Sequence, residues 1–219
     1  MDVIAVVGRK GGIGKSTIAG NLAAELVAMG KSVLLLDADP QHSLIAWASL
    51  GDGVLARIVR KIEDGEPDYI LSAVKRAKGV DIVVIDTPPG APETSRAAMA
   101  VADLALLPCG PSRLDLLALK DALALALKVR GERKSKRPRV RFVPSKVVPN
   151  TVLGRMLTPE LESMGKKVLG GITQRVGVAE AVDRGLTVGE FAPGSAGHLE
   201  FQELARAVVR ILEKNRLGY

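Results

Sequence analysis

The feature that most constrains this fold is a glycine-rich segment between an apolar run and a helix-like stretch. Val3–Gly8 has the length and composition of a buried strand, and Lys15–Met29 carries apolar residues at helical spacing. Gly30 follows, at a position where glycine commonly ends a helix. A glycine-rich turn that leads from a strand into a helix directs backbone N–H groups toward a phosphate. The sequence therefore predicts a phosphate-binding loop before the first helix.

The residue types in this loop suit that chemistry. The predicted nucleotide contacts are Lys10, Gly11, Gly12, Ile13, Gly14, Lys15, Ser16 and Thr17. The glycines let the backbone curve without Cβ clashes, Lys15 supplies positive charge for the outer phosphates, and the Ser16 hydroxyl is placed to bind Mg²⁺. The usual pattern G-x-x-x-x-G-K-[ST] is not met strictly, because Arg9 replaces its first glycine, and a second lysine, Lys10, lies within the loop. The alternative is a strand-to-helix turn with incidental lysines.

Two further apolar runs end in an aspartate. Asp37 ends the run Val33–Asp37, and Asp86 ends the run Ile82–Asp86. The C-terminal ends of parallel strands meet at the edge of a sheet where ligands bind. We therefore expect Asp37 and Asp86 to converge on the Mg²⁺ held by Ser16, through water. For each aspartate the alternative is a helix cap or a turn.

Strand-length apolar runs alternate with helix-like stretches along the whole chain, which predicts an α/β fold. The expected strands are Val3–Gly8, Ser32–Asp37, Asp81–Asp86, Leu104–Pro108, Val140–Ser145 and Val168–Thr173. The expected helices are Lys15–Met29, His42–Leu50, Asp68–Ala77, Glu93–Val101, Arg113–Arg130, Val152–Met164 and His198–Lys214. Continuous apolar strands indicate a mostly parallel twisted sheet with helices on both faces. We expect residues 1–219 to form a single domain; Gly51–Pro67 is hard to assign and is compatible with a helix flanked by loops.

Composition excludes several classes of protein. The one cysteine, Cys109, permits no internal disulfide and no thiolate metal cluster within one chain, and its apolar surroundings favour a buried structural thiol. No stretch has the length and apolarity of a membrane span, and Met1 leads straight into the first strand, so we expect a soluble cytosolic protein. The segment Lys128–Arg141 holds eight basic side chains and one acidic one, so its own net charge is +7. This equals the net charge of the whole chain. It is either a contact for a polyanion or a solvated loop, and as a helix-to-strand connection it should lie opposite the phosphate loop.

Several motifs together resemble one family. The loop reads K-G-G-x-G-K-[ST], the second strand continues as D-A-D-P-Q from Asp37 to Gln41, and Ile85 opens I-D-T-P-P. On these motifs the chain is identified as a member of the ParA/MinD superfamily of deviant Walker A ATPases, a branch of the P-loop NTPases. It is most similar to the small ParF-type partition ATPases in the segments Pro40–Leu44 with Trp47, Ala102–Asp115 and Ile172–Arg175. Those proteins lack an N-terminal DNA-binding extension, and this chain likewise begins at its first strand.

The resemblance implies an activity and roles for individual residues. It implies a homodimer formed with ATP and Mg²⁺, in which Lys10 of one subunit reaches the phosphates held by the other. Asp39 would orient the attacking water, and Lys10, Lys15 and Asp39 are therefore the expected catalytic residues. For Asp39 the alternative is a cap before Pro40. Hydrolysis would be slow and stimulated by a centromere-binding partner of the ParB type, and the ATP-bound form would bind DNA without sequence preference on the nucleoid.

Other members of the superfamily are less compatible with the sequence. The nitrogenase iron protein and the iron–sulfur carriers need cysteines that this chain lacks. A MinD-like protein ends in a membrane-binding helix; here His198–Lys214 has an apolar side and a basic edge, which indicates core packing, with DNA or membrane contact as alternatives. A metabolite kinase or synthetase fits the second loop lysine poorly. The expected function is DNA partition, with positioning of a protein cargo or MinD-like membrane cycling as the alternative.

Two further sites rest on topology. Arg175 is the first candidate for DNA binding, because it follows an expected strand on the edge that carries the nucleotide; a structural ion pair is the alternative. Ser145–Asn150 follows the fifth expected strand at the same edge and is the candidate for adenine contacts.

Overall fold

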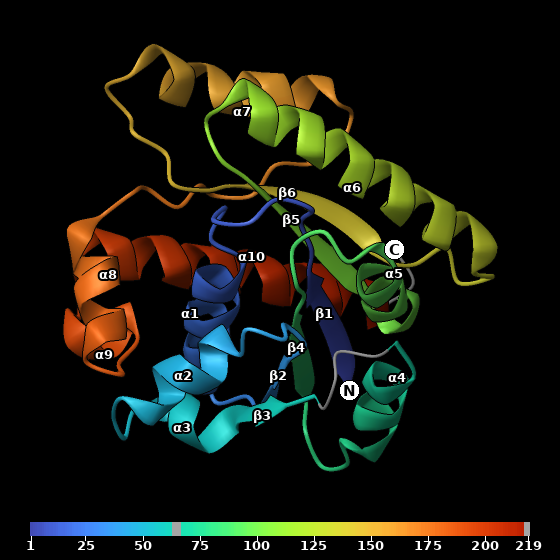
Figure 1. Ribbon diagram of the computed structural model, residues 1–219, viewed down its shortest axis with the longest axis horizontal. Helices are drawn as coiled ribbons and strands as arrows, with labels where there is room; N and C mark the ends of the chain where they lie inside the picture. The colour runs from blue at the N-terminus through green and yellow to red at the C-terminus, as the bar shows by residue number, and fades with distance from the viewer. Residues whose placement is uncertain (63–66, 217–219) are drawn as a thin grey trace.

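A six-stranded parallel sheet forms the centre of the molecule (Figure 1). The computed structural model describes residues 1–62 and 67–216, and the strands lie in the order β3-β2-β4-β1-β5-β6. Their bounds are β1 Asp2–Val6, β2 Val33–Asp37, β3 Val59–Lys61, β4 Ile82–Asp86, β5 Leu104–Cys109 and β6 Arg139–Pro144. Every pairing between them is parallel, as the continuous apolar runs predicted.

Helices cover both faces of this sheet and divide the core into two layers. The helices are α1 Lys15–Ala28, α2 Ser43–Ser49, α3 Val54–Ile58, α4 Pro67–Arg76, α5 Pro92–Val101, α6 Arg113–Glu132, α7 Val152–Ser163, α8 Val176–Asp183, α9 Val188–Phe191 and α10 Ala196–Arg216. One layer packs α1, α2, α3 and α10 around Ile18, Trp47 and Phe201. The other packs α4, α5, α6 and α7 around Met99 and Leu157. The predicted α/β class with helices on both faces is confirmed.

The prediction of a strand at Val168–Thr173 is wrong. This segment runs beside β6 but makes only two isolated bridges, Phe142 with Val168 and Val147 with Thr173. Pro144 has no N–H group to donate, and the Gly170-Gly171 pair weakens strand propensity at the same level. The remaining backbone bonds, such as Ile172 N–H to the Pro144 carbonyl at 2.8 Å, hold the segment without a ladder.

The segment Gly51–Pro67 contains more structure than its sequence suggested. It holds α3 and the short edge strand β3, while residues 63–66 lie outside the described part of the chain. In β3 only Val59 is buried, whereas Arg60 and Lys61 are exposed, so no apolar run marks the strand. Helices α8 and α9 were not predicted; both are short, and α9 spans four residues held by a capping box between Thr187 and Glu190.

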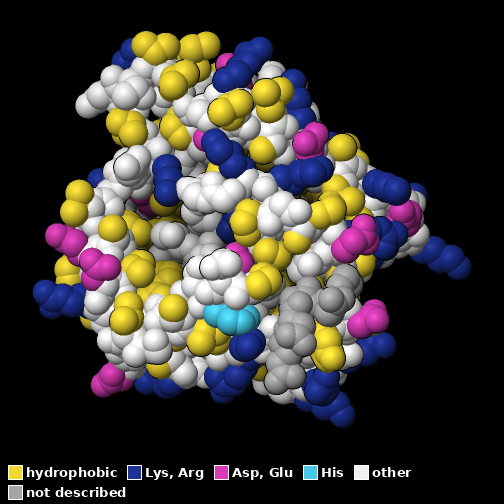
Figure 2. Space-filling view, in the orientation of Figure 1, with side chains coloured by type: hydrophobic (Ala, Val, Ile, Leu, Met, Phe, Trp, Pro, Cys, Tyr) yellow, Lys and Arg dark blue, Asp and Glu magenta, His cyan; other side chains and the backbone are white. Residues whose placement is uncertain are grey.

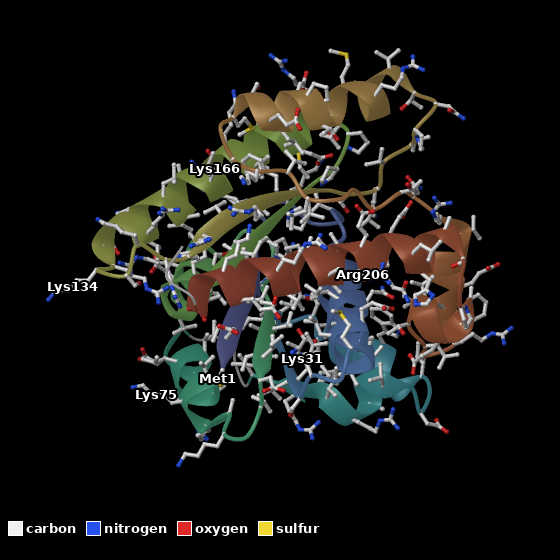
Figure 3. All side chains as sticks on the ribbon, turned by 180° about the vertical axis from the view of Figure 1, so that it is seen from behind. Met1, Lys31, Lys75, Lys134, Lys166 and Arg206 are labelled. Carbon is white, nitrogen blue, oxygen red and sulfur yellow. The ribbon has the colours of Figure 1, made fainter. Side chains whose placement is uncertain are left out.

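The basic segment Lys128–Arg141 divides into structural and exposed residues. α6 continues to Glu132 and β6 begins at Arg139, so the connection lies at the N-terminal ends of the strands, opposite the phosphate loop, as expected. Arg133 donates to the carbonyls of Met99 and Ala102 at the end of α5, and Arg137 pairs with Asp103. Lys134 and Lys136 are exposed, and Lys134 extends from the end of the molecule (Figure 3).

The C-terminal helix packs on the sheet, as its pattern predicted. α10 crosses the side of the molecule that faces the viewer in Figure 3, with Phe201, Leu204 and Val208 buried in the core. Arg206 and Arg210 lie on its exposed side. The apolar side of α10 is thus already occupied by this chain's own core. Within the described residues, no helix combines the length and apolarity needed to cross a membrane.

Candidate functional site

The glycine-rich loop connects the C-terminal end of β1 to the start of α1. Gly12 and Gly14 adopt left-handed backbone conformations, with φ of 75° and 86°. A Cβ atom on Gly14 would lie 2.8 Å from the Ser145 hydroxyl, so this position requires glycine for space as well as for conformation. Gly14 caps α1 without any side-chain hydrogen bond. The first N–H groups of α1 therefore receive no side-chain cap, which is the arrangement that an anion-binding helix start needs, and their contact with phosphate stays a prediction.

Lys15 is a buried ammonium at the head of this helix. It is 6% exposed, and its Nζ donates to the Lys10 carbonyl at 3.1 Å. Burial lowers the pKa of Lys15, while the carboxylates of Asp86 and Asp39 act in the opposite direction. Lys15 thus lies within electrostatic reach of both aspartates. Further negative charge in the loop would stabilise the charged form of Lys15.

The two strand-end aspartates lie side by side. Asp37 and Asp86 are direct partners in the β2–β4 pairing, and Val6 of β1 is the partner of Asp86 on the other side. Both aspartates are fully buried. Asp37 accepts backbone N–H groups from Asp39, Leu44 and Ile45 at 3.0–3.2 Å. Asp37 therefore fills the structural role that was the alternative to metal binding, since it accepts N–H groups in a turn and at a helix start. Its role as a metal ligand stays a prediction.

Asp86 is different, because neither of its carboxylate oxygens accepts a hydrogen bond of ordinary geometry among the described residues, although the Ser16 hydroxyl lies close enough to act on it. Burial raises the pKa of Asp86 to about 7; the Ser16 hydroxyl and Lys15 oppose this shift, and Asp37 adds to it. A buried carboxylate without partners favours a cation or a proton. In the described part of the chain, no three His, Cys, Asp or Glu side chains cluster to hold a metal on their own. A Mg²⁺ ion at Ser16 and Asp86 fits, with phosphate and water oxygens completing its shell.

Replacing Asp86 by asparagine is expected to stabilise the nucleotide-free chain at alkaline pH. The raised pKa means that the folded protein holds a proton on Asp86 between about pH 4 and 7 that the unfolded chain releases. Stability from this group is complete below about pH 4 and is lost as the pH rises through 7. In EDTA, Asp86→Asn should raise the free energy of unfolding by roughly 4 kcal/mol at pH 8 and change it little at pH 4.

Urea unfolding at the two pH values measures this difference. Asp52→Asn, at an exposed loop position, is the matched control and should behave like the wild type at both. An equal gain at pH 4 and pH 8, or none at pH 8, would show that ionisation of Asp86 carries no cost in the folded chain.

Asp39 lies close to the loop in a tight turn. It is 7% exposed, its Oδ1 accepts the Gln41 N–H at 2.9 Å, and its carbonyl accepts the His42 N–H. His42 is the residue that precedes α2, so Asp39 is a turn residue and not the helix cap. Its proposed contact with water remains a prediction.

Lys10 makes an ion pair that the sequence did not predict. Its Nζ lies 2.6 Å from Oδ1 of Asp115, the third residue of α6. Beside this pair is a hollow of about 230 Å³ on the outer side of the loop, lined in part by Lys146, Val148 and Gln174. One sequence pattern could have indicated the position of Asp115. A serine follows a proline at the start of a helix, and a carboxylate follows three residues later, which is typical of the first turn of a helix. The loop-side location expected for residues 145–150 is thus observed, and their contact with adenine stays a prediction.

Arg175 lies near the same edge but is engaged within the chain. Its guanidinium binds Glu200 Oε1 at 2.7 Å, and the other oxygen of Glu200 accepts the Thr173 N–H at 3.0 Å. The structural ion pair, the alternative to DNA binding, is therefore present. A role of Arg175 in DNA binding is untested and remains a prediction.

Comparisons with known proteins agree with this architecture. Residues 4–188 match the family described as the CobQ/CobB/MinD/ParA nucleotide binding domain. The chromosome-partitioning ATPase Soj of Thermus thermophilus is 31% identical over 242 residues, covering 94% of each chain. The maintenance of carboxysome distribution protein A of Gloeobacter kilaueensis is 40% identical over 126 residues, 57% of this chain and 56% of that protein. The septum site-determining protein MinD of Pyrococcus horikoshii, solved with Mg-ADP, superimposes with a TM-score of 0.72 at 22% identity, covering 98% of each chain.

Proposed function

The chain belongs to the CobQ/CobB/MinD/ParA nucleotide-binding family, and we propose that it is a Mg-ATP-dependent ATPase that segregates DNA. In this proposal the protein dimerises with ATP bound and binds DNA without sequence preference. It is released from DNA when a ParB-type partner stimulates its slow hydrolysis of ATP. It acts in the cytoplasm, on the nucleoid when ATP-bound. The full-length similarity to a chromosome-partitioning ATPase supports this choice of cargo.

One observation supports nucleotide hydrolysis most directly: the buried carboxylate of Asp86 lies within reach of Ser16 and Lys15 at the uncapped start of α1, and it accepts no hydrogen bond of ordinary geometry from the described residues. A structural aspartate at this depth would be expected to accept hydrogen bonds, as Asp37 does. Ser16 and Asp86 would hold Mg²⁺, which supplies positive charge for the phosphates when bound.

The residues of this chain would then divide the work of phosphoryl transfer. The loop N–H groups and Lys15 position the phosphates and neutralise their charge. Asp39 lies near Lys15, where its carboxylate can orient a water molecule. Lys10 of the partner subunit would add a further positive charge, so that full catalysis requires a dimer.

The surface beside the loop supports a dimer. Hydrophobic side chains gather over α6 and α7 at the top of the face shown in Figure 2. The exposed large hydrophobic residues on these helices are Leu114, Leu117, Leu127, Val152, Leu153 and Met156. Contiguous exposed apolar surface on a protein commonly marks an interaction site.

A second candidate is positioning of a protein cargo by the same chemistry. The similarity to the carboxysome distribution protein, at 40% identity, favours it, although the matched region spans just over half of that relative. MinD-like membrane cycling has less support, because the apolar side of α10 packs in the core.

DNA binding measured with ATP, with ADP and without nucleotide tests the proposal. We expect salt-sensitive, sequence-independent binding with ATP and much weaker binding otherwise. If the exposed lysines of the basic segment contribute, Lys134→Gln/Lys136→Gln should lower the slope of log affinity against log salt by about 2. Lys75→Gln/Lys78→Gln, at two exposed positions on α4 and in the turn after it, is the matched control and should leave that slope unchanged. No ATP-dependent binding at low salt would reject DNA as the cargo and favour a protein assembly.

A further inference from the structure

Basic side chains gather along β6, the edge strand that follows the connection after α6. Arg139 and Arg141 both lie in β6, and because successive side chains of a strand alternate between its faces, these two share one face of the sheet. Val143, the next residue in that alternation, packs in the layer that contains α10, whereas Val140 and Phe142 pack in the other layer. Arg139 and Arg141 are therefore on the α10 side of the sheet, which faces the viewer in Figure 3.

Lys167 reaches the same face from a distant part of the chain. Its carbonyl accepts the Phe142 N–H at 3.1 Å, and Phe142 forms a parallel bridge with Val168. Val168 packs in the same layer as Phe142, whereas Leu169 packs in the α10 layer. Because side chains alternate along an extended segment, Lys167 is on the α10 side, next to Arg141.

The charges of these side chains are not balanced within the chain. Arg130, near the end of α6, lies within electrostatic reach of Arg141, whose guanidinium donates to the Val140 carbonyl at 2.8 Å. Burial lowers the pKa of Arg141, and the charges of Arg139 and Arg130 lower it further. In the described part of the chain, no carboxylate forms an ion pair with Arg130, Arg141 or Lys167. We call Arg130, Arg139, Arg141 and Lys167 the β6 cluster.

An excess of like charge at one place favours an anionic partner. Repulsion between neighbouring cations destabilises the folded chain, and a bound anion relieves it. Lys167 is exposed and the three arginines are partly exposed, so an anion in solution can reach them. Arg175, at the nucleotide edge, differs in this respect, because its guanidinium is already paired with Glu200 at 2.7 Å.

The arrangement of the β6 cluster suits an extended polyanion. Arg139 and Arg141 are two residues apart, or about 7 Å along the strand, so the charges form a row. At the start of β6 this row continues into the exposed side chains of Lys134 and Lys136. Lysine and arginine contact the phosphates of a nucleic-acid backbone without reading its bases. A row of such side chains therefore matches a sequence-independent contact with duplex DNA.

We propose that the β6 cluster binds the backbone phosphates of duplex DNA. The inference rests on the proposed function, for which it names the surface that touches DNA. β6 is two strands away from β1, which carries the phosphate loop, so the cluster exists in each subunit before any nucleotide binds. ATP then raises DNA affinity by joining two subunits, because a dimer holds two clusters and the second contact becomes intramolecular.

Binding to a fluorescent DNA duplex, measured by anisotropy without nucleotide over a range of low salt concentrations, tests the cluster in the single subunit. Arg141→Gln/Lys167→Gln should lower the slope of log affinity against log salt by about 2, whereas Arg141→Lys/Lys167→Arg, which keeps both charges, should retain the wild-type slope. Lys75→Gln/Lys78→Gln is the matched control and should also retain it. An unchanged slope in Arg141→Gln/Lys167→Gln would overturn the proposal.

A second variant covers the case in which loss of Arg141 prevents folding, since that side chain is partly buried. Arg130→Gln/Lys167→Gln leaves β6 intact and should lower the slope by the same amount. Thermal unfolding without DNA shows whether each variant is folded. A folded Arg130→Gln/Lys167→Gln chain with the wild-type slope would likewise overturn the proposal.

The same measurement with ATP separates this inference from the proposed function. Arg141→Gln/Lys167→Gln should lose at least about ten-fold in affinity for DNA at fixed salt, while its ATP hydrolysis without DNA stays at the wild-type rate. If the wild type binds DNA with ATP and this variant binds equally well, the DNA surface lies elsewhere and the proposed function stands. If the wild type binds no DNA even with ATP, both fail. A variant that loses binding to vesicles rich in phosphatidylglycerol but keeps its affinity for DNA would make the cluster a lipid contact and overturn the proposal.

Discussion

Lys15→Ala is expected to abolish ATP binding, with a loss of at least about 100-fold in affinity, or roughly 2.7 kcal/mol. The Lys15 ammonium is buried at the start of α1, within electrostatic reach of Asp86 and Asp39. Without it, a triphosphate would bring its charge into a pocket that already holds two carboxylates and has lost its nearest cation. Titration calorimetry or a fluorescent ATP analogue measures the change.

Loss of the fold is not expected to explain that result. Burial opposes the charge on Lys15, so alanine removes an unfavourable desolvation along with one hydrogen bond. Thermal unfolding without nucleotide should therefore show a folded variant. Lys75→Ala, at an exposed position on α4, is the control and should bind ATP normally. Wild-type affinity in Lys15→Ala would contradict the assignment of the loop.

Asp39→Ala should bind ATP and dimerise but hydrolyse at least about 100-fold more slowly, since a group that positions or activates water contributes 10²–10⁴-fold. Asp39 is nearly buried and lies near Lys15, so its carboxylate can act on a water molecule beside the outer phosphate. Single-turnover phosphate release with saturating Mg-ATP isolates this step from binding.

Asp39→Asn separates catalysis from structure. The asparagine carbonyl can still accept the Gln41 N–H, which preserves the turn that Asp39 forms. If the carboxylate charge matters for hydrolysis, both variants should be slow. If Asp39→Asn hydrolyses like the wild type while Asp39→Ala does not, the residue acts only through the turn. Rapid turnover by Asp39→Ala would remove the proposed catalytic role altogether.

The elements that could be predicted from sequence are those with long apolar patterns. Strands β1, β2, β4, β5 and β6 and the helices α1, α2, α4, α5, α6, α7 and α10 lie within a few residues of their expected bounds. The errors occur where local pattern and tertiary contact disagree. β3 exists because it pairs with β2, although two of its three residues are exposed, and 168–173 lacks a ladder because Pro144 cannot donate to it.

The candidate site divides in the same way. The loop, Lys15 and the two strand-end aspartates follow from local sequence, since strand C-termini must meet at one edge of a parallel sheet. The difference between the two aspartates does not, because Asp37 accepts backbone N–H groups at the start of α2, while Asp86 accepts none from the part of the chain that the structure describes. Nor does the pairing of Lys10 with Asp115, which lie 105 residues apart in the chain.

The sequence by itself determined the kind of fold and the chemistry of the loop, because both follow from interactions between near neighbours: apolar periodicity, glycine conformations and a lysine and serine at a helix start. The tertiary structure decided which charges are satisfied. Burial and packing bring side chains from distant segments together. Only that arrangement shows Arg175 bound to Glu200, Lys10 paired with Asp115, and Asp86 buried without a well-formed hydrogen bond from the described residues.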